Sequence, residues 1–232
     1  MEHITKYPIL MLHGVGFRDL KWPLYWGRIP AALRSMGAEL YYGQQDSWAR
    51  VEENAKTVKA RIRQILDETG AEKVNIIAHS KGGLEARMAA SSLGMGGQIA
   101  SITTMPYFFA VCRDFSTAWA EAFNRENPDV PGVFYQSYAG VMRSPLSDIN
   151  LSTANGIVKL IEGANDGLVT VESARWGEKF TLLTGRSRRG VSHYDEIDFR
   201  RAPLSYETDG DGVADICGVY RQIVTDLAER GF

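Results

Sequence analysis

The sequence predicts one α/β domain with a mostly parallel central sheet that is flanked by helices on both faces. Short apolar runs alternate with longer amphipathic stretches along the chain, which is typical of parallel strands joined by crossover helices. The length of 232 residues suits a single domain that buries a substantial core. The sequence has no internal repeat, low-complexity tract or linker, so the predicted domain spans residues 1–232.

The strands are predicted from short apolar or alternating segments. Residues 8–12 form a continuous apolar run of the kind that is buried within a parallel sheet. Residues 133–138 instead alternate in polarity, which indicates a strand with two different faces. The six predicted strands span residues 8–12, 38–42, 73–78, 98–104, 133–138 and 180–184.

The helices are predicted from apolar residues at helical spacing, and the segment 47–69 is the clearest case. Its apolar positions recur every three or four residues with charges between them, and Gly70 follows as a helix-ending residue. A last amphipathic segment, 213–230, closes the domain. The five predicted helices span residues 22–36, 47–69, 81–93, 114–126 and 213–230.

The strongest functional signal is a small-x-Ser-x-Gly turn between a predicted strand and a predicted helix. Ser80 lies at the tip of this turn, with Ala78 two residues before it and Gly82 two residues after it. Such a turn is so tight that larger residues at these two positions would collide, and it leaves the serine hydroxyl pointing out of the sheet. Ala78 replaces the glycine usual at the first of these positions. Ser80 is therefore the predicted nucleophile.

A serine nucleophile needs a base, and the chain has four histidines. His3 lies in the terminal tail, and His13 is expected to shape the loop after the first strand. His79 is inside the turn, where its side chain should point away from the tip and pack or hydrogen-bond structurally. His193 lies in a loop between the last strand and the closing helix, and it is the predicted base.

The acid that orients the base should lie between the serine and the histidine in the chain. Asp166 fits this order, because it stands at the tip of a polar turn that follows the apolar run 157–161. An ordinary Asp-Gly turn is the alternative interpretation. Asp148, Glu162 and Asp195 are the competing candidates.

Stabilisation of an oxyanion requires donors that are fixed before the charge develops, which favours backbone amides. One predicted donor is the amide of Lys81, the residue after the nucleophile. The other is the amide of Val15, in a loop where Gly14 and Gly16 allow the backbone to turn its amides inward.

Composition excludes several other classes of function. The formal net charge is −2, so neither a nucleic-acid footprint nor a polybasic membrane anchor is indicated. The one basic cluster, Arg186–Arg189, is expected to be a solvated loop. No apolar run has the length of a membrane span, and the start of the chain has no apolar leader, so we expect a cytoplasmic protein as the chain stands, with secretion open if the start was trimmed. Cys112 and Cys217 are expected to be free buried thiols, and a disulfide between them is the alternative.

Four segments carry these motifs in one order: residues 8–16, 74–83, 165–169 and 192–195. Together they resemble the bacterial triacylglycerol lipase and carboxylesterase family of α/β-hydrolases over nearly the whole chain. The resemblance implies the α/β-hydrolase fold and the same triad of Ser80, Asp166 and His193. It also implies an oxyanion hole of the Val15 and Lys81 amides, with substrate beside Gly14, Gly16 and Phe17.

The family also suggests a structural calcium ion that steadies the histidine loop. Asp195, two residues after the base, would then face Asp148, and hard carboxylate ligands suit calcium. A pair of capping or salt-bridging aspartates is the alternative. The family's glutamine-type ligand has no match here, since Phe199 lies near its position, and the zinc-binding insertion of some relatives is not visible.

The clearest departure from the family follows the strand at 98–104. The relatives continue there into a long lid of amphipathic helices, whereas this chain begins its next predicted helix at 114. Only 85 residues separate Ser80 from Asp166, so we expect a minimal or absent lid. Tyr107, Phe108 and Phe109 would then form an acyl-binding wall beside an open cleft, or else belong to the core.

The sequence therefore predicts a serine carboxylic-ester hydrolase that acts through an acyl-enzyme on short- to medium-chain esters or glycerides. Weak interfacial activation and no cofactor for the chemistry are expected. An acyltransferase or thioesterase with the same triad is one alternative. A non-catalytic module that binds apolar ligands or a partner is the other.

Overall fold

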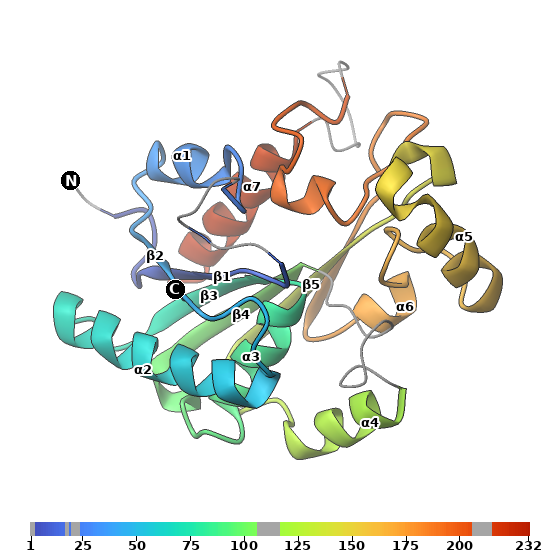
Figure 1. The fold of residues 1–232 in the computed structure, drawn as a ribbon. Coiled ribbons are helices and arrows are strands. Elements are labelled where there is room, and N and C mark those ends of the chain that lie inside the picture. The colour runs from blue at the N-terminus through green and yellow to red at the C-terminus, as the bar shows by residue number, and fades with distance from the viewer. Residues whose placement is uncertain (1–2, 17–18, 20–23, 106–116, 206–214) are drawn as a thin grey trace.

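A computed structural model describes residues 3–16, 19, 24–105, 117–205 and 215–232 of the chain. Six strands form one sheet in the order β2-β1-β3-β4-β5-β6, and every neighbouring pair is parallel (Figure 1). The strands are β1 Ile9–Leu12, β2 Leu40–Tyr42, β3 Val74–His79, β4 Ile99–Met105, β5 Phe134–Gly140 and β6 Lys179–Leu183. The predicted mostly parallel sheet is confirmed.

Helices cover both faces of this sheet. In Figure 1, α1 and α7 lie above the sheet, while α2 and α3 lie below it. The α-helices are α1 Ile29–Arg34, α2 Val51–Thr69, α3 Lys81–Ala90, α4 Thr117–Glu126, α5 Ser152–Ile161, α6 Val171–Ala174 and α7 Ile216–Glu229. Short 3₁₀ turns include Pro145–Ser147, Ile149–Leu151 and Asp195–Ile197.

The alternation of side chains along β1 builds two separate core layers. Ile9 and Met11 point to the face covered by α1 and α7, and they pack in one apolar cluster with Tyr220 of α7. Leu10 and Leu12 point to the other face and pack in a second cluster with residues of α2 and α3. Both faces of the sheet are therefore buried, as a parallel sheet requires.

Each predicted strand is present, with ends that differ from the prediction by at most two residues. The predicted helix 22–36 is shorter, since α1 begins only at Ile29. The predicted helix 47–69 begins at Val51, because Arg50 is in an extended conformation with φ −67° and ψ 158°. Gly70 ends α2 in the left-handed conformation, with φ 70°, as expected for a glycine at this position.

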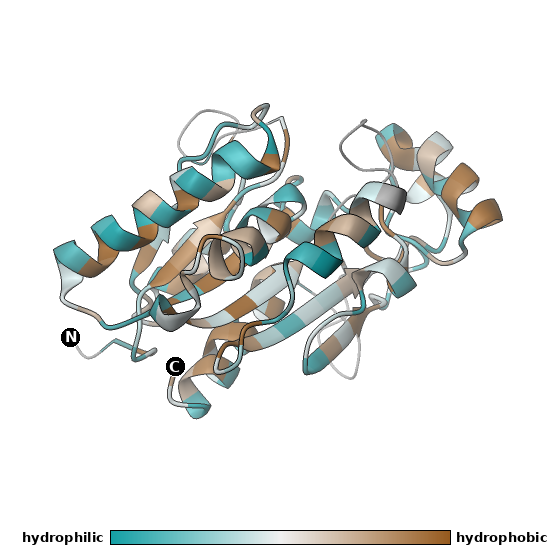
Figure 2. Cartoon of the chain, turned by 90° about the horizontal axis from the view of Figure 1, so that it is seen from below, coloured by the Kyte–Doolittle hydropathy of each residue, from teal (hydrophilic) through white to brown (hydrophobic). Residues whose placement is uncertain are grey.

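Two helices, α5 and α6, were not predicted. The apolar run 157–161 forms the second half of α5, and it does not pack into either core layer. Instead α5 and the 3₁₀ turns before it present large aliphatic side chains to solvent, and Figure 2 shows brown apolar residues along this helix. These exposed residues are Leu146, Ile149, Ile157, Leu160 and Ile161.

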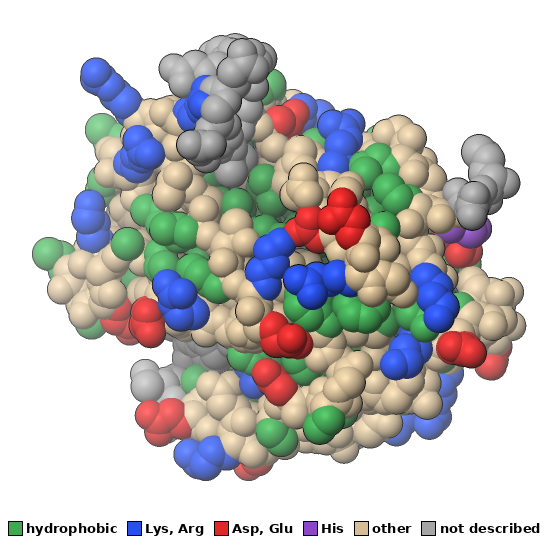
Figure 3. All heavy atoms as spheres, turned by 180° about the vertical axis from the view of Figure 1, so that it is seen from behind, with side chains coloured by type: hydrophobic (Ala, Val, Ile, Leu, Met, Phe, Trp, Pro, Cys, Tyr) green, Lys and Arg blue, Asp and Glu red, His purple; other side chains and the backbone are tan. Residues whose placement is uncertain are grey.

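The surface and the helices give two further observations. On the face shown in Figure 3, acidic and basic side chains are interspersed, without a broad basic patch among the residues described there. Within the described ranges, none of the helices combines the length and the apolar character needed to cross a bilayer.

Candidate active site

The predicted nucleophile occupies a strained turn between β3 and α3. Ser80 has φ 53° and ψ −132°, a conformation that residues other than glycine adopt only under constraint. Gly82 is needed here, since a Cβ atom would lie 2.6 Å from the carbonyl oxygen of Leu12. The first turn of α3 therefore packs directly against the end of β1, and this contact helps to hold the serine at the tip of the turn.

The loop after β1 lies directly against the serine. A Cβ atom on Gly14 would be 2.7 Å from the Cβ atom of Ser80 and 3.2 Å from its Oγ, so only glycine allows this approach. Gly16 has φ 90° and is open to solvent. His13 holds the same loop, because its Nδ1 lies 2.7 Å from the Gly14 carbonyl oxygen and its Nε2 lies 3.0 Å from that of Gln45. The structural role predicted for His13 agrees with these contacts.

Asp166 and His193 form a buried pair. His193 Nδ1 lies 2.8 Å from Asp166 Oδ2, and the His193 amide donates to the Asp166 carbonyl oxygen at 2.8 Å. The other carboxylate oxygen, Oδ1, accepts from the amides of Leu168 at 2.8 Å and Val169 at 2.7 Å. Backbone amides thus hold one oxygen of the Asp166 carboxylate, and the other oxygen bonds to the imidazole. Among the competing acids, Glu162 is exposed and Asp148 and Asp195 have other partners.

The turn that carries Asp166 is held by its neighbour Asn165. The Asn165 side chain accepts from the Gly167 amide at 2.9 Å and from the Asn155 side chain at 2.7 Å. Gly167 has φ 110°, so the turn needs glycine there. The Asp-Gly sequence therefore builds the turn and also places the acid.

The two predicted oxyanion donors are consistent with the observed backbone. The Gly14 amide already donates to Tyr25 Oη at 2.8 Å, which leaves the next amide, that of Val15, as the donor in this loop. The Lys81 amide is the first of α3, and a first-turn amide has no acceptor within its own helix. The assignment of Val15 and Lys81 to the oxyanion hole remains a prediction.

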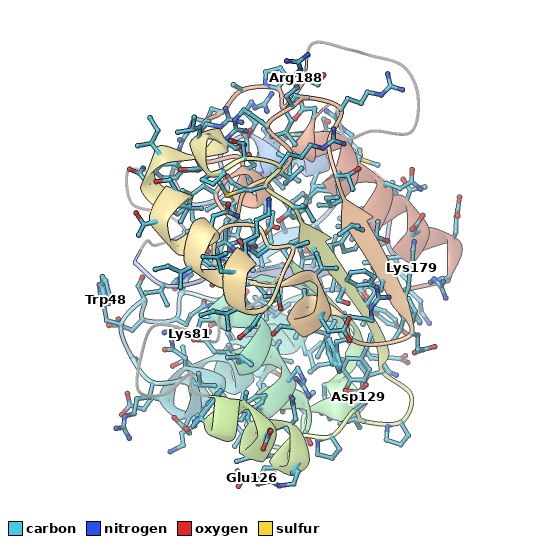
Figure 4. All side chains as sticks on the ribbon, turned by 90° about the vertical axis from the view of Figure 1, so that its right-hand side faces the viewer. Trp48, Lys81, Glu126, Asp129, Lys179 and Arg188 are labelled. Carbon is cyan, nitrogen blue, oxygen red and sulfur yellow. The ribbon has the colours of Figure 1, made fainter. Side chains whose placement is uncertain are left out.

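The side chain of Lys81 leaves the site. Its ammonium group donates to the carbonyl oxygens of Ser47 at 3.1 Å and Ala49 at 2.7 Å, and it lies 3.4 Å from Glu85 Oε1. In Figure 4, Lys81 is labelled in the interior, below the projecting Trp48. Burial raises the pKa of Glu85 to about 7 against the opposing effect of Lys81. Only the Lys81 amide is therefore available to the reaction.

Three buried residues lie next to the triad, and only one of them, His79, was given a role from the sequence, namely structural packing or hydrogen bonding. The His79 ring lies 4.4 Å from the His193 ring between centroids, and His79 Nδ1 lies 2.6 Å from Tyr25 Oη. Glu196 Oε2 lies 3.3 Å from His79 Nε2 and 3.6 Å from His193 Nδ1. The sequence holds one faint signal, because Glu196 stands three residues after His193, but it does not show that a 3₁₀ turn points Glu196 back at the base.

The residues proposed for calcium do not fit that ion. Arg189 Nη1 lies 2.7 Å from Asp195 Oδ2, and Arg200 donates to Asp195 Oδ1 at 2.8 Å from Nε. Arg189 also donates to the Ser147 carbonyl oxygen at 2.8 Å, next to Asp148. Two guanidinium groups thus occupy both oxygens of a buried carboxylate and supply the positive charge that a metal would bring. The expectation that Arg186–Arg189 is only a solvated loop is wrong for Arg189.

Two other clusters of metal-binding residue types occur among the described residues. One consists of His79, His193 and Glu196, and the other of Asp198, Asp215 and Cys217. In the first, both histidines use Nδ1 for the partners given above. In the second, both carboxylates are paired with Arg28, at 2.6 Å for Asp198 and 3.0 Å for Asp215. The carboxylates of the second cluster are therefore already neutralised by a guanidinium group.

Several predicted residues cannot be placed. Phe17, Tyr107, Phe108 and Cys112 lie outside the described residues, and so does Phe109. The substrate-binding roles of Phe17 and the aromatic segment stay predictions. Cys217 is described, and it is a free buried thiol.

The described geometry can be compared with known proteins. No family profile matches the chain. A triacylglycerol lipase of Vibrio cholerae is 39% identical over 88 residues, which are 38% of this chain and 28% of that protein. Triacylglycerol lipase 2 of Saccharomyces cerevisiae is 25% identical over 248 residues and covers 90% of this chain and 74% of its own. For the lipase of Vibrio cholerae and three further bacterial triacylglycerol lipases, the match spans about a third of the relative's length or less.

Solved structures share the fold at low sequence identity. The mature Bacillus licheniformis lipase BlEst2 superposes with a TM-score of 0.69 and 18% identity, covering 84% of this chain and 90% of that one. The metagenomic carboxyl esterase MGS0156 superposes with a TM-score of 0.73 and 12% identity, covering 98% of this chain and 77% of that one.

The chain therefore has the α/β-hydrolase fold, as predicted. In sequence it is similar to triacylglycerol lipases, and in fold to a lipase and a carboxyl esterase.

Proposed function

We propose that this protein hydrolyses carboxylic esters through an acyl-enzyme on Ser80. The observation that carries the proposal is the buried pair of His193 and Asp166, 2.8 Å apart, in a chain that also holds Ser80 in a strained turn between β3 and α3. A serine nucleophile, a histidine base and an aspartate that orients the base make up the triad of serine hydrolases. Lipases and carboxyl esterases among the similar proteins support the same class of reaction.

In the proposed mechanism, the proton moves through His193. Because His193 Nδ1–H donates to Asp166, the other ring nitrogen of the neutral imidazole is unprotonated and takes the proton of the Ser80 hydroxyl. Ser80 Oγ bonds to the ester carbonyl carbon, and the carbonyl oxygen becomes an oxyanion facing the amides of Val15 and Lys81. His193 then returns the proton to the departing alcohol. Water repeats the sequence and releases the acid.

The proposed substrates are short- to medium-chain esters or glycerides. The short segment between β4 and α4 supports soluble esters, since it leaves little chain for a lid. The exposed aliphatic side chains of α5 support glycerides as substrates too, because an apolar surface near the Asp166 turn can contact the acyl chains of a lipid droplet. Hydrolysis of p-nitrophenyl esters from acetate to palmitate would define the preferred chain length.

The decisive experiment replaces the nucleophile. The Ser80→Ala variant should lose about 10⁴-fold or more in turnover of p-nitrophenyl butyrate, as in other triad enzymes. Ser152→Ala removes a hydroxyl that, among the described residues, bonds to the nearby Ile149 carbonyl oxygen and to no part of the triad, and it should keep full activity. A fluorophosphonate should label the wild type at Ser80. Undiminished hydrolysis by Ser80→Ala, or no labelling of the wild type, would refute the proposal.

The acceptor of the acyl group is tested by product analysis. Added alcohol or an acyl-CoA donor would yield new esters or free CoA if the chain is an acyltransferase or thioesterase, since the same triad serves all three reactions. For the weak interfacial activation that we propose, tributyrin turnover should rise smoothly through the solubility limit. A sharp increase at that limit would contradict it.

A further inference from the structure

Behind the triad, a buried set of polar groups connects the loop after β1 to Asp166. Tyr25 Oη accepts from the Gly14 amide at 2.8 Å and lies 2.6 Å from His79 Nδ1. His79 Nε2 in turn lies 3.3 Å from Glu196 Oε2. Neither of these last two atoms has a hydrogen-bond partner of regular geometry among the described residues, so the two face each other in a close polar contact. The proposed mechanism assigns no role to Tyr25, His79 or Glu196.

We assign the protons along this connection starting from the hydrogen bond between Gly14 and Tyr25. Tyr25 Oη accepts from the Gly14 N–H, and we assign its own O–H as the donor to His79 Nδ1. A neutral His79 then carries its proton on Nε2, directed at Glu196. Burial, and next the neighbouring His193, lower the pKa of His79 well below its usual value, so the neutral ring is the stable form.

Glu196 is placed where a second negative charge would be costly. Its Oε1 accepts from the Gly140 amide at 2.9 Å, and Gly140 must be glycine, because a Cβ atom would lie 2.5 Å from that oxygen. Asp166 and Asp195 are the acidic groups that face Glu196, and His79 and His193 are the histidines. Burial and then the charge of Asp166 raise the pKa of Glu196 well above its usual value.

We propose that Glu196, in its uncharged form, and Tyr25 are positioning residues for the reaction, joined through His79 into one chain of polar contacts from the Gly14 loop to Asp166. Uncharged Glu196 lies against His79 Nε2 and donates its own proton towards Asp166. Asp166 then remains the single negative charge beside His193. At the other end, Tyr25 holds the Gly14 amide, which fixes the backbone that presents the next amide to the oxyanion. This inference rests on the proposed esterase function.

The experiment compares two variants of the connection with a matched control. Tyr25→Phe removes the hydroxyl that joins Gly14 to His79. Tyr220→Phe removes another buried tyrosine hydroxyl, which donates to the Glu196 carbonyl oxygen at 2.9 Å but lies outside the connection. Turnover of p-nitrophenyl butyrate is measured per active site, with sites counted by fluorophosphonate labelling. We expect Tyr25→Phe to lower kcat by about tenfold or more with little change in KM, and Tyr220→Phe to stay within about threefold.

The charge of Glu196 is tested by the pH profile of kcat/KM. Glu196→Gln removes no charge if Glu196 is already neutral, so the midpoint of the acid limb should move by less than about 0.3 pH unit. If Glu196 were ionised in the wild type, the substitution would remove a negative charge near His193, and the limb would move down by about one pH or more.

Three outcomes would overturn the inference. A downward shift of the acid limb in Glu196→Gln overturns the uncharged form. Equal kcat per site for Tyr25→Phe and Tyr220→Phe overturns the positioning role and leaves the esterase function intact. A wild type that neither hydrolyses the ester nor reacts with the fluorophosphonate overturns both the inference and the function on which it rests.

Discussion

The pair of arginines on Asp195 leads to a prediction about what holds the histidine loop in place. Arg189 joins two segments, because its guanidinium binds Asp195 after His193 and also the Ser147 carbonyl oxygen. The Asp195 side chain is only 1% exposed, and that of Arg189 is 25% exposed. Replacing Arg189 by methionine keeps the unbranched, apolar stem of the side chain and removes all of these donors.

The size of the effect follows from what remains after the substitution. Leaving a buried charge without its partner costs about 3–5 kcal/mol. In Arg189→Met, Arg200 still binds the other carboxylate oxygen and the Ser192 amide still donates to Oδ2, so we expect a loss of about 2–3 kcal/mol. For a chain of this length, each kcal/mol lowers Tm by about 2–4 °C, which gives a decrease of about 4–12 °C.

Thermal unfolding, followed by calorimetry with and without a chelator, measures this effect. Arg188→Met is the matched control, since Arg188 is the exposed neighbour that projects from the top of the molecule in Figure 4, and its Tm should change by less than about 1 °C. Chelation should leave the wild-type Tm unchanged, because guanidinium groups occupy Asp195. A wild-type Tm that falls with chelator and recovers with calcium, or an Arg189→Met variant as stable as Arg188→Met, would refute the reasoning.

Two further predictions concern a buried acid and a close backbone contact. Since burial raises the pKa of Glu85 from 4.5 to about 7, its protonated form stabilises the fold at low pH, and up to about 3 kcal/mol of that stability is lost as the pH rises from about 4.5 to about 7. Urea unfolding at about pH 5 and about pH 8 should show this loss in the wild type and not in Glu85→Gln; an equal loss in both would assign it to other groups. Gly14→Ala should lower kcat by about 100-fold, because its Cβ would collide with Ser80, whereas Gly156→Ala, where a Cβ meets open space, should keep full activity. Near-normal kcat in Gly14→Ala would mean that this loop does not have to approach the serine.

Much of this fold could be predicted because its signals are local. The alternation of apolar runs and amphipathic stretches marked all six strands, since a strand buried on both faces is apolar throughout and a helix is apolar on one side. The helix α5 was missed because the same rule does not hold for it. Its apolar residues 157, 160 and 161 are exposed, so they do not follow the rule that apolar residues pack into the core.

The residues of the candidate site also fall into two groups, those that local motifs predict and those that depend on distant partners. Ser80, Asp166 and His193 are carried by short motifs whose backbone requirements appear in the sequence, such as the glycines at 82 and 167. The contacts of Glu196 and Arg189 are different, because each reaches across a turn to atoms that belong to other segments. An acidic or basic residue in a polar loop has the same local appearance whether it is solvated or buried.

The sequence by itself determined the order of the six strands and of the helices that pack on them, and it predicted the nucleophile turn and the residues of the triad. These depend on side-chain periodicity and on tight turns, which act over a few residues. Only the tertiary structure decided that arginines occupy the position considered for calcium, and that a second carboxylic acid lies beside the catalytic pair. Those features arise from partners 42 to 56 positions apart in the chain, as in the bonds of Arg189 to Ser147 and of Gly140 to Glu196. Burial is the physical reason, because a buried carboxyl group must either pair with a cation, as Asp195 does, or tend towards its uncharged form, as Glu196 does.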